Sequence, residues 1–288
     1  MAQLIVNGLA MGAIYALVAL GFILIVNAVG VLNFAQGELL MLGAFIGVTL
    51  AVTLGLPVPL AVLAMLPIMG LVGYLFQLVA YYPLRDKPLL TVIIATIGVG
   101  IALQNLAQVV WGAYPLRLPP LIPTDPVHVG GLVVLPYQLL VLAVTFALVG
   151  GQHLLFSRTQ LGRMMRATAQ DMEAARLMGI RVRHTIATTF VMSTMLAGLA
   201  GMLVGPLFYV STDMGGMVLL KAFAAAIIGG FGSIPGAVVG GLFLGVAEIL
   251  VAGYISSAYK DAVAFAILIL VLYLFPQGFF GEKIAERA

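Results

Sequence analysis

The chain lacks cysteine altogether and has very few charged residues. Its 288 residues include no Cys, and only 8% are Asp, Glu, Lys or Arg, whereas about a quarter is usual in a globular domain. Without cysteine there can be no disulfide, thiolate metal site or thiol nucleophile. A soluble fold of this length needs a charged surface that the composition does not supply. The sequence therefore excludes the ordinary soluble globular class.

The chain instead contains long apolar runs, and 63% of its residues are hydrophobic. Several runs reach the ~20 residues that cross a hydrocarbon core of ~30 Å as a helix. They are too long for barrel strands and do not alternate in polarity, so helices are the expected solution. The sequence predicts an all-α, polytopic membrane protein, a single transmembrane domain over 1–288 with eight or nine transmembrane or half-membrane helices. The runs cover 4–26, 39–56, 58–80, 89–111, 132–150, 186–210 and 261–276.

Positive charge is concentrated in one segment, residues 158–183, with the sequence "RTQLGRMMRATAQDMEAARLMGIRVR". It holds six basic and two acidic residues, a net charge of +4, so the rest of the chain, at +3 − 4, carries −1. Short basic loops stay in the cytoplasm, which predicts a cytoplasmic loop here and a cytoplasmic tail after Phe280. The proline-rich loop at about 112–136 is expected outside, with the amino terminus. The carboxyl terminus falls inside if 217–252 forms two crossings or an equivalent broken pair.

A glycine-rich stretch, "KAFAAAIIGGFGSIPGAVVGGLFLG", occupies residues 221–245. The spacings Gly236–Gly240 and Gly241–Gly245 are typical of helix faces that pack closely in membranes. An alternative is that "GGFGSIPG" breaks a helix at membrane depth, beside protein or an aqueous path. Both interpretations involve the same residues: Gly229, Gly230, Gly232, Gly236 and Gly240. No G-x-x-x-x-G-K-[ST] motif occurs, so the chain shows no phosphate-binding loop of its own.

The basic loop carries apolar residues at helical spacing between 161 and 179, which predicts a short amphipathic helix outside the membrane. Its apolar positions are Leu161, Met165, Ala169, Met172 and Ala175. One interpretation is attachment to anionic lipid headgroups. The letters "EAARLMGI", residues 173–180, favour another, because they resemble the EAA signature of ABC importer permeases. In that family a short cytoplasmic helix docks into a cleft of the ATPase subunit.

Further stretches narrow the resemblance. "LNFAQGELLMLGAF" (32–45), "FVMSTMLAGLAGMLVGPLF" (190–208) and "LKAFAAAIIGGFGSIPGAVVGG" (220–241) resemble the branched-chain amino-acid permeases, H-type subunit. The resemblance implies a non-enzymatic permease subunit of an ATP-driven importer for leucine, isoleucine, valine or related amino acids in the bacterial inner membrane. Because similar permeases import urea or short amides, those compounds remain alternative substrates. An ion-coupled secondary transporter is a weaker alternative, because few intramembrane acids are present.

The resemblance also implies partners and coupling residues. The partners are a second, unlike permease subunit, two cytoplasmic ATPase subunits, an external substrate-binding protein and the lipid bilayer, with no nucleic acid. No metal or cofactor is expected on this chain, since the partner ATPases use the ATP. Gly179 is expected to end the coupling helix with a positive φ. The expected coupling residues are Arg166, Glu173, Ala174, Ala175, Arg176 and Gly179.

Polar residues inside apolar runs are candidates for a translocation path, because such residues usually face the bundle interior or water. The candidates are Asn33, Gln36, Glu38, Gln104, Gln108 and Glu248. Several have a simpler interpretation: Asn33 can cap a helix that begins near Phe34, with Glu38 near its first turn, and Gln104 and Gln108 can hydrogen-bond between helices. Lys221 is expected to snorkel to the membrane surface. The histidines lack H-E-x-x-H spacing, which disfavours an intramembrane metalloprotease.

Overall fold

The computed structural model describes residues 1–122, 125–129 and 132–280 and consists of two compact units. Unit 1 contains Met1–Ile23, Ile122–Val149 and Leu220–Ala288, and unit 2 contains Leu24–Leu121 and Gly150–Leu219. The chain thus enters each unit more than once, and three long helices run from one unit into the other. The predicted cytoplasmic tail after Phe280, residues 281–288, lies outside the described residues.

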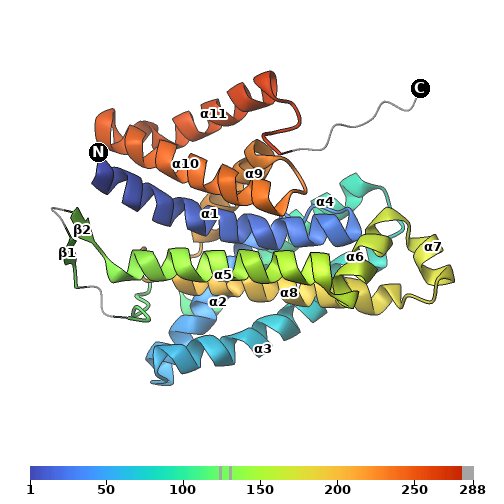
Figure 1. Ribbon diagram of the computed structural model, residues 1–288. Helices are drawn as coiled ribbons and strands as arrows, with labels where there is room; N and C mark the ends of the chain where they lie inside the picture. The colour runs from blue at the N-terminus through green and yellow to red at the C-terminus, as the bar shows by residue number, and fades with distance from the viewer. Residues whose placement is uncertain (123–124, 130–131, 281–288) are drawn as a thin grey trace. The chain divides into compact units, whose positions relative to one another are not determined.

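Helices make up nearly all of the described structure (Figure 1). Local residues limit some of them: α4 (Leu89–Trp111) follows Pro88 and ends before Gly112, which has a φ of 88°. The α-helices are α1 (Ala2–Val29), α2 (Gln36–Val48), α3 (Val58–Phe76), α4 (Leu89–Trp111), α5 (Pro136–Arg158), α6 (Gln160–Gln170), α7 (Met172–Leu177), α8 (Val182–Val204), α9 (Met214–Gly229), α10 (Ile234–Tyr254) and α11 (Lys260–Leu274). The π-helical turns η1 (Thr49–Thr53) and η2 (Gln77–Tyr81) and the 3₁₀ turns η3 (Tyr82–Leu84) and η4 (Ser257–Tyr259) complete the set.

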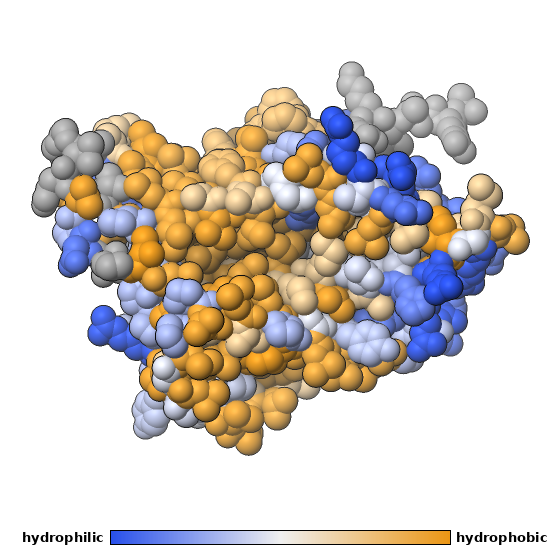
Figure 2. Space-filling model, turned by 60° about the horizontal axis from the view of Figure 1, so that its bottom comes forward, coloured by the Kyte–Doolittle hydropathy of each residue, from blue (hydrophilic) through white to orange (hydrophobic). Residues whose placement is uncertain are grey.

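Eight helical segments of the described chain are long and apolar enough to cross a membrane. They are 2–29, 36–53, 58–84, 89–111, 136–158, 182–204, 234–254 and 257–274, and the shorter apolar helix α9 is a ninth element. The prediction of a polytopic helical membrane protein is confirmed. Figure 2 shows hydrophobic side chains over the middle of the visible face, with hydrophilic ones towards both sides and most densely on the side that carries α6 and α7.

Glycines set the packing of unit 1. A side chain on Gly241 or Gly245 would overlap the backbone of α1 at Gly12, so this face of α10 lies directly against α1. A side chain on Gly240 would overlap the carbonyl of Ala225 in α9. Helices in lipid have no hydrophobic driving force to associate, so close packing of their backbones stabilises their association instead. Each of the two glycine faces therefore lies against one neighbouring helix.

A hairpin covers one end of unit 1. Strand β1 (Val127–Val129) pairs antiparallel with β2 (Leu132–Val134), with Val127 opposite Val134. The backbone N–H of Val133 donates to Oε1 of Gln3 at 3.0 Å. The amino terminus and the hairpin therefore lie at the same end of unit 1.

Helices α2, α3 and α8 form the centre of unit 2. A side chain on Gly43 of α2 would overlap the backbone of Gly198 in α8, and a side chain on Gly198 would overlap Met65 and Met69 of α3. Phe190 of α8 stacks on Phe76 at a ring distance of 5.9 Å and contacts Tyr81 at 5.2 Å. Such paired aromatic rings add to ordinary apolar burial.

Two local predictions were wrong. The apolar run 132–150 was expected to be helical from its start, but 132–134 form β2 and the helix starts at Pro136, which suits a first helical turn. The single amphipathic helix expected between 161 and 179 is two helices, α6 and α7. The chain breaks at Asp171, whose backbone is extended (φ −158°, ψ 111°).

Candidate functional site

The first candidate site, on the loop predicted to be cytoplasmic, is built around the short helix α7. Oδ1 of Asp171 accepts hydrogen bonds from the backbone N–H groups of Glu173 and Ala174, at 2.8 and 3.0 Å. This is the capping that a helix N-terminus needs, and it explains why α7 starts separately from α6. Gly179 follows the helix with a φ of 81°, as predicted, and Ile180 N–H bonds back to the carbonyl of Ala175. Sequence-local signals therefore define both ends of α7.

The coupling candidates do not share one face. Ala175 is buried within unit 2, whereas Glu173, Ala174 and Arg176 are exposed. Arg166 donates to the backbone carbonyl of Phe156 at the end of α5, which attaches α6 to that helix. The tip of α7 presents two large apolar side chains to solvent: Leu177 is 89% exposed and Met178 83% exposed. Sequence reasoning missed this tip, although both residues stand inside the EAA-like stretch.

Two polar side chains of the stretch 32–42 have definite structural roles. Gln36 is completely buried and exchanges two hydrogen bonds with Ser193 of α8, at 3.3 Å to its carbonyl and 3.1 Å from its hydroxyl. Asn33 accepts from the backbone N–H of Ala35 at 3.1 Å, which shapes the turn before α2. Helix α2 itself begins at Gln36, and no side chain caps it. The amide Nδ2 of Asn33 is buried without a hydrogen bond in the described structure.

Glu38 lies in the first turn of α2, where the helix dipole favours a negative charge. Its Oε2 is shielded from solvent and has no hydrogen-bond partner among the described residues. The carboxylate lies against α4 at Gly100, where a side chain would come within 3.3 Å of Oε2. A carboxylate oxygen left in this condition is costly inside protein. It therefore needs water, a proton or a ligand from outside the chain.

Gln104 and Gln108 lie one turn apart on α4, on a helix that is mostly exposed. Gln104 is half-buried and Gln108 exposed. Neither side chain makes a hydrogen bond within the described part of the chain, so the interhelical bond that the sequence favoured is not present there. Asn105 instead bonds to the carbonyl of its own helix at Ile101, at 2.7 Å.

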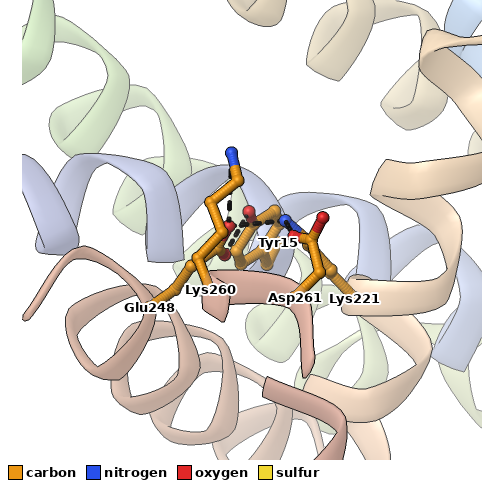
Figure 3. Close-up of polar contacts among 5 residues, drawn as sticks. All are labelled: Tyr15, Lys221, Glu248, Lys260 and Asp261. Carbon is orange, nitrogen blue, oxygen red and sulfur yellow. Dashed lines mark hydrogen bonds and ion pairs between the residues drawn. The ribbon is translucent and has the colours of Figure 1, made fainter. Parts of the chain in front are cut away.

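Glu248 belongs to a buried ionic cluster in unit 1 (Figure 3). The Nζ of Lys221 (α9) lies 2.5 Å from Oε1 of Glu248 (α10) and 2.7 Å from Oδ1 of Asp261 (α11). The hydroxyl of Tyr15 (α1) donates to Oε2 of Glu248 at 2.7 Å. Lys260 completes the set at 4.0 Å from Glu248. Two cations and two anions give the cluster no net charge.

The cluster corrects the expectation for Lys221. Its side chain is only 7% exposed and points into the protein between two carboxylates, so the predicted snorkelling to the membrane surface is wrong. The physical reason is that Glu248 and Asp261 compensate the charge where it stands, and lipid cannot. Tyr15, Asp261 and Lys260 were not singled out from the sequence. The sequence did contain a signal, because Lys221 and Glu248 are an isolated cation and an isolated anion in neighbouring apolar helices. Such charges are expected to form a pair.

The glycine-rich candidates form the connection between α9 and α10. The helices are interrupted at 230–233, where Gly230 and Gly232 have φ values of 108° and 90°. Ser233 caps α10 by accepting from the backbone N–H of Gly236 at 3.1 Å. Side chains on Gly229 or Gly236 would overlap each other's carbonyls, so the two helices touch at this point.

The chain matches known transport proteins over nearly its whole length. The family model described as branched-chain amino acid transport system / permease component matches residues 4–272. The high-affinity branched-chain amino acid transport system permease protein BraD of Pseudomonas aeruginosa is 41% identical, over 99% of this chain and 97% of the relative. The corresponding Escherichia coli protein LivH is 36% identical with the same coverage. A probable LivH of Methanocaldococcus jannaschii is 29% identical over 92% of this chain and 88% of its own length.

No solved structure matches the chain. The matches span nearly the whole sequence and confirm the resemblance inferred from its motifs. They make the chain a transport permease component of a multi-pass membrane type, and not a catalytic subunit. The chain belongs to the family of branched-chain amino acid transport system permease components.

Proposed function

We propose that this chain is one of two unlike membrane subunits of an ATP-driven importer, and that it carries leucine, isoleucine, valine or a related amino acid across the bacterial inner membrane. The relatives' names describe high-affinity branched-chain amino acid transport. Two cytoplasmic ATPase subunits would supply the energy, and an external binding protein would deliver the substrate. The two units of the chain would work together as one permease domain.

The observation that carries the proposal is α7 with its apolar tip. A six-residue helix, capped by Asp171 and ended by Gly179, presents Leu177 and Met178 to solvent beside the exposed Glu173 and Arg176. Large apolar side chains surrounded by charges, outside the membrane spans, are typical of a surface that a partner covers. The ATPase cleft implied by the EAA-like sequence is the partner that we propose.

Polar groups without partners mark the proposed path. Glu38 Oε2 and Asn33 Nδ2 are buried and have no hydrogen-bond partner among the described residues, and Gln108 is exposed on α4. Such groups are costly without a polar partner. Water or a zwitterionic amino acid that enters beside the start of α2 would satisfy the two buried groups, and a surface shared with the second permease would cover Gln108. Gln36 contributes indirectly, because its bonds to Ser193 fix α2 on α8.

The orientation that we propose places the amino terminus outside and the carboxyl terminus in the cytoplasm. Within unit 1, Tyr254 at the end of α10 bonds to Met1 at 3.0 Å. Phe279, which follows the end of α11, lies at the opposite end of α10. Its backbone N–H donates to the carbonyl of Ile228 at 2.9 Å. Met1 and Phe279 thus lie at opposite ends of α10, which supports the proposed orientation.

Co-purification tests the proposal. The chain, tagged and extracted with its partners, should bring down two ATPase subunits and a second permease, and the complex should accumulate labelled leucine only with ATP. Competition by unlabelled urea or a short amide would instead indicate the alternative substrates. Uptake by the isolated chain, driven by an ion gradient, would contradict the proposal.

A further inference from the structure

A surface pocket of about 390 Å³ lies in unit 2 between η3 and the start of α8. Four arginines line it: Arg85, Arg176, Arg181 and Arg183. The guanidinium of Arg85 lies 4.1 Å from the centre of the Tyr82 ring, and that of Arg183 lies 5.0 Å from it. Arg176 is also close enough to Tyr82 to interact with it electrostatically. The ring thus holds two of the cations in place by cation–π contact.

The positive charge in this pocket is not balanced by the chain. Arg85 pairs with Asp86 at 3.2 Å, but the Asp86 side chain is 83% exposed, and a surface ion pair of this kind contributes little. Arg176, Arg181 and Arg183 form no ion pair within the described residues. The hydrogen bond with Tyr82 raises the pKa of Arg85 above its usual value, so this group stays charged. Four like charges directed at one space repel one another unless an anion enters.

The place of the pocket indicates the source of the anion. Tyr82 stands near the end of the apolar segment 58–84, and Val182 begins the apolar helix 182–204, so the pocket lies at the ends of two candidate spans, where a membrane surface is expected. Ile180, Val182 and Ile186 form the rest of its lining. A site with guanidinium groups beside an apolar wall suits a phosphate attached to a lipid. Arginine is well matched to the phosphate, because its planar donors can bind two oxygens at once.

We propose that this pocket binds the phosphate headgroup of an anionic glycerophospholipid, with the arginines around the phosphate and the isoleucine and valine side chains against the glycerol and upper acyl chain. The site requires only that these helix ends lie at the membrane surface. It does not depend on the transported substrate, and it shares Arg176 with the proposed ATPase-docking surface of α7. It would fix η3 and the start of α8 to one another through the lipid.

The test compares two pairs of substitutions in the full chain, reconstituted in bilayers of phosphatidylcholine that contain spin-labelled phosphatidylglycerol. Arg85→Gln with Arg183→Gln removes the two cations that contact Tyr82. Arg158→Gln with Arg163→Gln removes the same charge from exposed positions outside the pocket. We expect the preference for phosphatidylglycerol over labelled phosphatidylcholine to fall roughly tenfold in the first pair and less than about threefold in the second.

The other outcomes overturn the proposal. An equal fall in both pairs would show general attraction of the basic loop to the membrane. Displacement of the labelled lipid from the wild-type protein by soluble glycerol phosphate would indicate a free phosphate compound as the ligand. An unchanged lipid preference in the first pair, with loss of co-purified ATPase, would make the pocket a protein contact. ATPase recovery is measured on the same samples, so failure of this proposal is distinguishable from failure of the importer assignment.

Discussion

Lys221 and Glu248 carry opposite charges inside helices that are otherwise apolar, and they contact each other from different helices. Asp261 and Tyr15 satisfy the remaining positions around them. Removing one member of a buried ion pair leaves an uncompensated charge, which typically costs about 3–5 kcal/mol. The cluster ties α1, α9, α10 and α11 of unit 1, and its members should be strongly coupled.

Lys221→Met should therefore destabilise the protein by about 3–5 kcal/mol, because it removes the cation shared by the buried Glu248 and the partly exposed Asp261. Adding Glu248→Gln should recover part of the loss. Lys260→Met is the control, since Lys260 is 41% exposed and 4.0 Å from Glu248. Thermal unfolding in detergent, followed by size-exclusion chromatography, measures the effect. Equal destabilisation by Lys221→Met and Lys260→Met would refute the importance of the buried pair.

Glu38→Gln should leave the amount of assembled complex unchanged and lower the rate of transport. The substitution keeps the shape of the side chain but removes the charge from a carboxylate whose Oε2 has no partner in the described structure. Initial uptake rates, normalised to the assembled complex, measure the result. Unchanged uptake would restrict Glu38 to a role at the start of α2, and loss of assembly would place it in the contact with the second permease.

At the scale of the helix, α7 depends on its ends, because six residues cannot form a stable helix by propensity alone. Gly179→Val forces a β-branched residue into a φ of 81°, at a cost of roughly 1 kcal/mol or more. We expect normal membrane levels, weaker recovery of ATPase subunits and a proportional fall in uptake. Ala169→Val, at an exposed position of α6, should leave recovery unchanged.

Glu173→Lys tests the same helix by charge. It exchanges an exposed acceptor at the start of α7 for a donor and raises the charge of the loop by two. Docking into an ATPase cleft predicts lower ATPase recovery on purification. Attachment of the loop to anionic lipid predicts full recovery and tighter membrane association. Full ATPase recovery by both Gly179→Val and Glu173→Lys would contradict the docking assignment.

The sequence predicted helices well where local chemistry sets their limits. Helix α4 occupies the predicted run 89–111, since Pro88 and Gly112 delimit it, and the glycine spacings identified the close faces of α10. It failed where a single side chain competes with the helix, as Asp171 does between α6 and α7. The ionic cluster was also missed, because its members are up to 246 positions apart (261 − 15) and only tertiary packing brings them together.

At the scale of the whole molecule, the described structure provides eight candidate spans and a shorter ninth apolar helix. The distribution of charge, with +4 in residues 158–183, predicts that this loop is cytoplasmic. The chain contains no cysteine, so single cysteines can report the side directly. Cysteine at Tyr114, whose side chain is 86% exposed, should react with an impermeant reagent added outside, and cysteine at Thr159 should not. The opposite labelling pattern would invert the topology.

The most direct test of the importer assignment is ATP-dependent uptake by the purified assembly in liposomes. The chain is co-expressed with the genes for its candidate partners, purified through its own tag and reconstituted with ATP enclosed beside the ATPase subunits. The account predicts accumulation of labelled leucine, isoleucine or valine that requires ATP, the binding protein and an intact α7. Uptake that persists without ATPase subunits, or a complex that retains those subunits yet moves none of the three amino acids, would contradict it.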